Sequence, residues 1–165
     1  MRIQGKNKIV FDIDDVVRDL NKLITNRLGH NAENWEEGHV IHDIVRCRPE
    51  VLVEAGETPY AEVVKKYVSC PLFLSNQASS WQPYTNIWLD NHFDNYNVIY
   101  TNSFIEKEDL CEEVILVDDF PAFSDYNNVA LVDMSYNREV KQPLKRIKSP
   151  KDLMSLIKEY GTCLN

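Results

Sequence analysis

The sequence predicts an α/β protein with a three-layer, Rossmann-like core, in which helices cover both faces of a mainly parallel five-stranded sheet. Short runs of apolar residues without polar alternation recur along the chain, as is typical of strands buried on both faces. Segments with helical spacing of apolar residues separate most of these runs. Polar residues follow several of the runs directly, where a parallel α/β sheet places its ligand site. These three observations together predict the fold and the position of the site.

Composition limits the classes of function. The chain has 165 residues, of which 44% are hydrophobic, so it can form one domain with a sizeable core. Its net charge of −8 argues against binding to polymeric nucleic acid or to an anionic membrane surface. No apolar stretch reaches the ~20 residues of a membrane helix, and no apolar segment of a signal peptide precedes the first strand. The four scattered cysteines indicate reduced thiols, so we expect a cytoplasmic protein. The sequence leaves open whether the protein is a monomer or a homodimer.

The first half of the chain contains one strand followed by helical segments. An apolar run over residues 9–11 predicts a buried strand, and apolar residues at helical spacing predict a helix over 16–28. Shorter helical segments are expected over residues 40–47, 50–55 and 59–68. About 50 residues separate the first two strands, whereas a usual crossover needs a dozen or more. We therefore expect a core domain of residues 1–17 and 70–165, with a small helical insertion over 18–69 above the site.

The second half alternates strands and helices more regularly. Apolar runs predict strands over residues 71–76, 97–101, 114–117 and 129–132. Helices are expected over residues 81–93, 106–110 and 150–160. This alternation is the pattern of βα units on a parallel sheet.

A set of polar residues suits phosphoryl transfer. The set comprises Asp12, Asp14, Ser75, Asn76, Lys107, Asp118 and Asp119. Phosphoryl transfer needs a nucleophile, a metal that gathers phosphate oxygens, donors to those oxygens and a cation that offsets the accumulated charge. Clustered carboxylates repel one another unless a cation or a proton is shared, and Mg²⁺ prefers oxygen ligands. We therefore expect a magnesium-dependent site at the carboxyl ends of the strands.

Each residue of this set has an expected role. Asp12 is the expected nucleophile, which would form an aspartyl-phosphate, and Asp14 is the expected general acid and base. The expected metal ligands are Asp12, Asp14, Asp118 and Asp119, with Asp14 binding through its backbone carbonyl. Ser75 and Asn76 are expected to donate hydrogen bonds to phosphate, and Lys107 to pair with both the nucleophile and the phosphate.

The order of these residues resembles the motifs of the haloacid dehalogenase (HAD) superfamily of Mg²⁺-dependent phosphatases. Asp12-Ile13-Asp14 matches the first motif, Ser75 the second, Lys107 the third and Asp118-Asp119 the fourth. The resemblance covers essentially the whole chain, and the insertion has the position of that superfamily's C1 cap. Asp15 departs from the pattern because the superfamily usually has glycine there. We interpret Asp15 as a turn residue or as the N-cap of the helix that follows.

A narrower resemblance indicates the substrate. Residues 81–93, 116–121 and 134–138 are similar to the 5′-nucleotidase branch that includes the 5′(3′)-deoxyribonucleotidases. The resemblance implies a nucleoside monophosphate as substrate, and the phosphate of another small metabolite, such as a sugar phosphate, is the alternative. Trp35 and Arg138 are candidate substrate contacts. The competing functions are a receiver-like signalling domain and an inactive phosphate-binding module. A receiver has its acidic pair only on the first strand and its lysine late in the chain, whereas here a second acidic pair, Asp118 and Asp119, follows Lys107.

Overall fold

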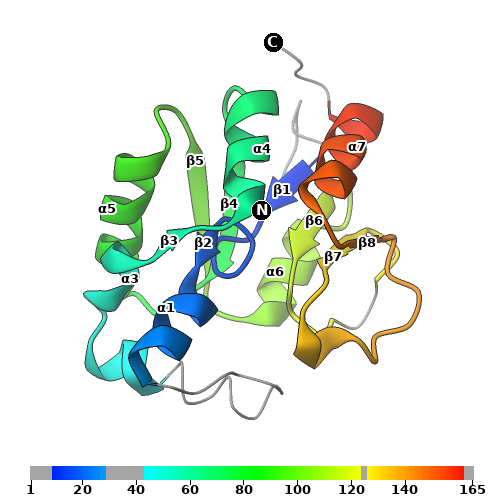
Figure 1. The fold of residues 1–165 in the computed structure, drawn as a ribbon. Helices are drawn as coiled ribbons and strands as arrows, with labels where there is room; N and C mark the ends of the chain where they lie inside the picture. Colours follow the sequence, from blue (N-terminus) through cyan, green and yellow to red (C-terminus); the bar gives the residue numbers. More distant parts are fainter. Residues whose placement is uncertain (1–8, 29–42, 124–125, 162–165) are drawn as a thin grey trace.

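A six-stranded parallel sheet forms the centre of the protein (Figure 1). The computed structural model describes residues 9–28, 43–123 and 126–161. The strands are β1 (Ile9–Phe11), β4 (Leu72–Asn76), β5 (Asn97–Thr101), β6 (Ile115–Asp118), β7 (Val129–Val132) and β8 (Lys145–Ile147). Their order across the sheet is β5-β4-β1-β6-β7-β8, and each neighbouring pair is parallel. The chain therefore builds the sheet outward from β1 in both directions, and the order reverses between β1 and β6.

The prediction of five strands was wrong by one. The additional strand, β8, pairs with β7 at the edge of the sheet and has the sequence Lys-Arg-Ile. Only Ile147 of the three is buried, because an edge strand that covers little of the core needs few apolar residues. The four strands predicted in the second half are all present, and β5 and β7 have the predicted bounds.

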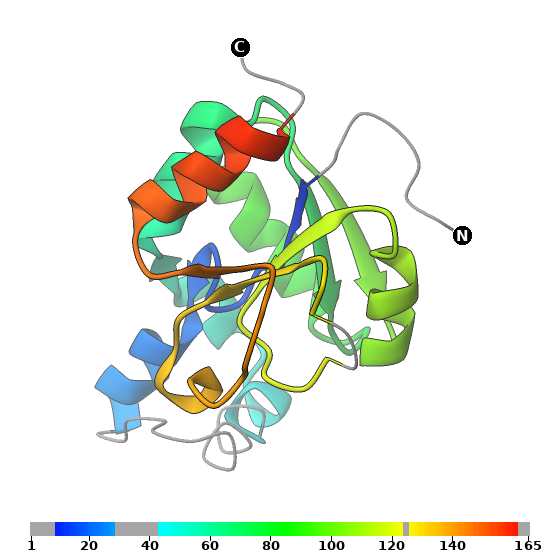
Figure 2. The same ribbon diagram turned by 90° about the vertical axis from the view of Figure 1, so that its right-hand side faces the viewer.

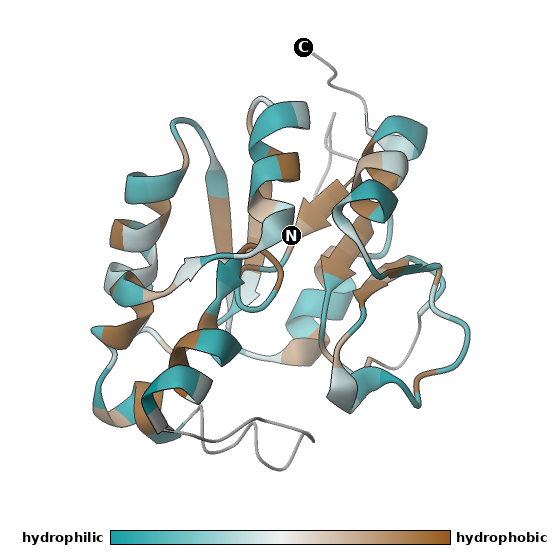
Figure 3. Ribbon diagram, viewed as in Figure 1, coloured by the Kyte–Doolittle hydropathy of each residue, from teal (hydrophilic) through white to brown (hydrophobic). Residues whose placement is uncertain are grey.

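Helices cover both faces of the sheet, as Figure 2 shows from the side. Successive strand residues point to opposite faces: Phe11 and Val117 join one apolar cluster, and Val10 and Leu116 join the other. Helices α4 (Pro59–Tyr67), α5 (Gln82–His92) and α7 (Pro150–Tyr160) pack on the first cluster, and α6 (Phe104–Leu110) packs on the second. Figure 3 shows β1 and β6, at the centre of the sheet, as predominantly hydrophobic. The predicted three-layer α/β arrangement is confirmed.

The helix predicted over residues 16–28 begins later than expected. Helix α1 (Leu20–Leu28) follows a tight turn and the short strand β2 (Arg18–Asp19). The backbone N–H groups of Val17 and Arg18 both donate to the Ile13 carbonyl, which bends the chain back before the helix starts. Strand β2 then pairs antiparallel with β3 (Gly56–Glu57). Val16 and Val17 are apolar because both are buried in this turn, and their spacing from Leu20 and Leu23 resembles that of a helix.

The segment between β1 and β4 contributes to two separate clusters. A small separate apolar cluster is formed by helix α1, the helical residues 43–47 and α3 (Val51–Glu54). Trp81 and Tyr84 of the core also contact this cluster. Helix α4 instead places Ala61 and Val64 in the main cluster beside the strands and packs against α7. The division into a core of 1–17 and 70–165 and an insertion of 18–69 stays a prediction. Helix α4 belongs to the predicted insertion by sequence, but it covers the sheet of the core. Within the described residues, no helix is both long and apolar enough to span a bilayer.

Candidate active site

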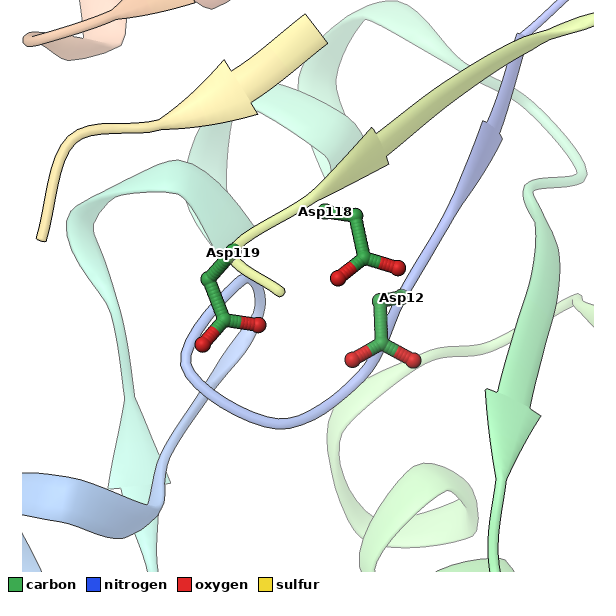
Figure 4. A group of neighbouring side chains, drawn as sticks. All are labelled: Asp12, Asp118 and Asp119. Atoms are coloured by element: carbon green, nitrogen blue, oxygen red, sulfur yellow. The ribbon is translucent and has the colours of Figure 1, made fainter. Parts of the chain in front are cut away.

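Three carboxylates meet where the strand order reverses. Asp12 directly follows β1, Asp118 ends β6, and Asp119 comes next (Figure 4). The register pairs Phe11 with Val117, and the Asp12 backbone N–H donates to the Val117 carbonyl at 2.8 Å, so the two strand ends are level. One oxygen of each carboxylate lies within 4.8 Å of an oxygen of each of the others. The crevice outside the carboxyl ends at such a switch point is the usual ligand site of this kind of sheet.

Lys107 joins two of these carboxylates. Its Nζ lies 2.8 Å from Oδ1 of Asp12 and 2.5 Å from Oδ2 of Asp118. The lysine is 1% exposed and reaches the site from α6, which packs on the face of the sheet that carries Val10 and Leu116. The pairing predicted between Lys107 and Asp12 is therefore present, and Asp118 is a second partner.

The negative charge of the site exceeds what Lys107 balances. The pKa of Asp12 is raised to about 7, mainly by burial; Lys107 opposes this rise, and the charges of Asp118 and Asp14 contribute to it. Burial, followed by the charge of Asp118, holds the pKa of Asp119 well above its ordinary value. Burial alone would lower the pKa of Lys107, but Asp118 and Asp12 outweigh it and raise that pKa. Such a group of carboxylates favours a bound cation or shared protons.

Hydrogen bonds hold Asp118 and Asp119 in place at the end of β6. Oδ1 of Asp118 accepts from the backbone N–H of Phe120 at 2.8 Å, so its other oxygen remains for Lys107. The Tyr136 hydroxyl donates to Asp119, and the Asn137 side chain donates to the Asp119 carbonyl at 2.9 Å. Tyr136 also lines the pocket, but the sequence alone assigned it no role.

Asp14 has a different environment from the other three. Its Oδ1 accepts from Nε of Arg18 at 2.7 Å, and its Oδ2 accepts from Nε2 of Gln77 at 2.8 Å. The carboxylate lines the same pocket as Asp12 but does not belong to the group of three that can hold an ion. The acid–base role of the Asp14 side chain and metal binding by its backbone carbonyl both stay predictions.

Asp15 adds a further carboxylate to the pocket. Its φ of 56° is left-handed, and its Oδ1 accepts from the backbone N–H of Asn21 at 2.8 Å. It is thus a turn residue, the first of the two interpretations, and it satisfies an N–H in the first turn of α1 rather than capping a helix that starts at Val16. Burial is the main cause that raises its pKa to about 7.

The remaining predicted residues have different outcomes. Ser75 and Asn76, at the end of β4, both line the pocket, and their donation to phosphate stays a prediction. Arg138 is exposed and is not among the lining residues, so the structure does not bring it to the site. Trp35 lies outside the described residues.

The rest of the pocket is largely apolar. Leu20, Val45 and Trp81 line it on the side of the small apolar cluster, and Phe104 and Phe120 line it on the side of α6. The two phenylalanine rings stack in parallel with their centroids 3.8 Å apart. The pocket encloses about 110 Å³, less than the ~300–1,000 Å³ of typical ligand sites. A small polar group fits at the carboxylates, with an apolar wall beside it.

Comparison of the chain with family models, with curated proteins and with solved structures finds no match.

Proposed function

We propose that the protein is a Mg²⁺-dependent phosphomonoesterase that acts through an aspartyl-phosphate. One observation carries the proposal: Asp12, Asp118 and Asp119 converge at the switch point of the sheet, with Lys107 between the first two. Ser75 lines the same pocket from the neighbouring strand. Nucleophile, charge compensation and a hydrogen-bond donor are the parts that phosphoryl transfer requires. The resemblance to the HAD superfamily leads to the same proposal.

The donor set fits Mg²⁺. The three clustered groups are carboxylates, which are oxygen ligands of the kind that Mg²⁺ takes, and the excess of negative charge over Lys107 favours a divalent cation. Asp12, Asp118 and Asp119 would hold the ion, together with the backbone carbonyl of Asp14. When bound, the ion supplies charge stabilisation for the phosphoryl oxygens.

In the first step, an Oδ atom of Asp12 attacks phosphorus. A bond forms between that oxygen and phosphorus, and the bond from phosphorus to the leaving oxygen breaks. Lys107 and Ser75 stabilise the charge that accumulates on the phosphoryl oxygens. Asp14, which faces the pocket, gives its proton to the leaving oxygen, so that an alcohol departs.

In the second step, water attacks the phosphorus of the aspartyl-phosphate. Asp14, now a carboxylate, takes a proton from this water as the oxygen–phosphorus bond forms. The bond between phosphorus and Asp12 breaks and returns the carboxylate. Phosphate leaves, and both aspartates have regained their starting protonation states.

The substrate that we favour is a (deoxy)nucleoside 5′-monophosphate. The resemblance to the nucleotidase branch supports this class, and the apolar wall of Trp81, Phe104 and Phe120 beside the carboxylates is compatible with a leaving group that carries a ring. Another small phosphorylated metabolite, such as a sugar phosphate, is the alternative.

A panel of phosphates tests the proposal. The full chain would be assayed with and without Mg²⁺ on nucleoside monophosphates, sugar phosphates and p-nitrophenyl phosphate, with release of phosphate as the readout. We expect turnover that needs Mg²⁺ and is fastest on a nucleoside monophosphate. Fastest turnover of a sugar phosphate would select the alternative substrate, and no turnover of any compound would refute the enzyme.

A pair of variants tests the nucleophile. Asp12→Asn should lower kcat by about 10³-fold or more, because a nucleophile that is removed cannot be replaced by its neighbours. Asp94→Asn makes the same change at an exposed position outside the pocket and should leave kcat unchanged. Retained activity in Asp12→Asn would contradict the role of Asp12.

A further inference from the structure

Four side chains form a closed ring of hydrogen bonds around the carboxylate of Asp14. Arg18 donates from Nε to Asp14 at 2.7 Å and from Nη1 to the hydroxyl of Thr85 at 3.1 Å. That hydroxyl donates to Oε1 of Gln77 at 2.7 Å, and Nε2 of Gln77 donates to the other oxygen of Asp14 at 2.8 Å. Each donor meets an acceptor, and the hydrogen bonds run from Arg18 to Asp14 by two routes, one direct and one through Thr85 and Gln77.

The ring is buried except at Asp14. Arg18 and Thr85 are 0% exposed and Gln77 is 4% exposed, whereas the side chain of Asp14 is 26% exposed and lines the pocket. The terminal torsion of an aspartate is broad, so a free carboxylate would sample many orientations. Donors fixed on both oxygens restrict that torsion to one orientation facing the pocket.

Further contacts hold Arg18 in place. Its guanidinium lies over the Trp88 ring, 5.5 Å from the centroid, and the Trp88 indole N–H donates to the Ala55 carbonyl at 2.7 Å. Among the described residues, Nη2 of Arg18 has no hydrogen-bond partner. A buried arginine with an unpaired donor is a costly way to stabilise a fold. Such departures from full pairing are expected where a side chain serves a functional site.

We propose that Arg18, Thr85 and Gln77 are positioning residues that aim the Asp14 carboxylate at the leaving oxygen. This inference rests on the proposed function, in which Asp14 is the general acid and base. None of the three needs to touch the reacting atoms, because each acts through Asp14. Loss of the ring should therefore slow proton transfer without weakening substrate binding, since small errors in the placement of a catalytic group cost large factors in rate.

The leaving group of the substrate separates this role from a structural one. The alcohol of thymidine 5′-monophosphate needs a proton to depart, whereas p-nitrophenolate does not. The variant Thr85→Val has a similar shape but lacks the hydroxyl that joins Arg18 to Gln77, and Thr85→Ser retains it. The full chain with Mg²⁺ would be assayed on both substrates, with the p-nitrophenolate burst followed before the steady state.

We expect kcat of Thr85→Val on thymidine 5′-monophosphate to fall about 10-fold or more, with KM within about 2-fold of the wild-type value. The rate of the p-nitrophenolate burst should change by less than about 2-fold. Thr85→Ser should recover most of kcat. Gln77→Leu removes the other donor to Asp14 and should give the same pattern, and the double variant should be no slower than the worse single variant, because one break already opens the ring.

Two results would overturn the inference. One is an unchanged kcat on thymidine 5′-monophosphate in folded Thr85→Val or Gln77→Leu. The other is an equal fall in kcat and in the burst rate, which would indicate general damage to the site. If Thr85→Val does not fold, Gln77→Leu provides the decision by the same readouts. A wild-type protein that turns over neither substrate would instead contradict the proposed function itself, so the two failures are distinguishable.

Discussion

Removal of Mg²⁺ should destabilise the protein, and the effect should depend on pH. In the metal-free protein the pKa of Asp12 is about 7, whereas an unfolded chain ionises this group near its ordinary value of 3.8. Between these two values the folded state binds more protons than the unfolded state, so the free energy of unfolding falls as pH rises. At 1.36 kcal/mol for each pKa unit, Asp12 contributes at most about 4 kcal/mol to this fall.

Binding of Mg²⁺ should reverse the loss at high pH. An ion present at 100 times its Kd stabilises the folded state by about 2.7 kcal/mol, which for a domain of this size raises Tm by about 5–10 °C. At pH 5.5 the ion has to displace a proton from Asp12, because the pKa of this group is about 7, and the raised pKa of Asp119 acts in the same direction. The shift in Tm should therefore be clearly smaller at pH 5.5 than at pH 8.

Thermal melts followed by circular dichroism measure this effect. Four conditions are needed: excess Mg²⁺ or a chelator, each at pH 5.5 and pH 8. Asp119→Asn removes one carboxylate of the cluster without touching Lys107 and should lose most of the shift, whereas Asp94→Asn should retain it. If Tm at pH 8 is the same with Mg²⁺ and with chelator, the carboxylate cluster is not a metal site and the reasoning fails.

Three further substitutions probe individual residues. Lys107→Met leaves two buried carboxylates unpaired and should lower the free energy of unfolding at pH 8 by about 3–5 kcal/mol in urea denaturation; a loss below about 1 kcal/mol would contradict the pairing. Tyr136→Phe removes one hydrogen bond to Asp119, worth about 1 kcal/mol, so the apparent Kd for Mg²⁺ in a titration of activity should rise about 5-fold with kcat retained; an unchanged Kd would mean that the hydroxyl does not support the site. Arg138→Ala should leave kcat/KM unchanged on every phosphate of the panel, because the side chain is exposed and outside the pocket, and a 10-fold loss would place it on the substrate.

The sheet and the positions of its polar ends were predictable because both depend on local pattern. Strands such as β7, with the sequence Val-Ala-Leu-Val, are buried on both faces and therefore apolar at every residue. Parallel strands bring their carboxyl ends to one edge, so Asp12 and Asp118 had to lie near each other once β1 and β6 were neighbours. The strand β8 was missed because pairing at an edge needs no apolar pattern.

The partners of the predicted residues were harder to predict, because they depend on packing between distant segments. The bond between Gln77 and Asp14 joins residues 63 positions apart, and the bond between Arg18 and Thr85 joins residues 67 apart. One local signal was present, since Arg18 follows Asp14 by four positions. Arg18 falls within the helix predicted over residues 16–28 and had no predicted role, so its ion pair with Asp14 was not predicted.

Asp15 illustrates how a local exception can fit the same site. A left-handed backbone costs most residues about 1–2 kcal/mol, although aspartate tolerates it better than most. The bond that its side chain accepts from Asn21 in the first turn of α1 is worth about as much as an N-cap, about 1 kcal/mol, which offsets much of that cost. The same carboxylate adds negative charge to the pocket that Asp12, Asp118 and Asp119 line. Where glycine would only permit the turn, aspartate therefore both holds the start of α1 and adds a carboxylate to the proposed cation site.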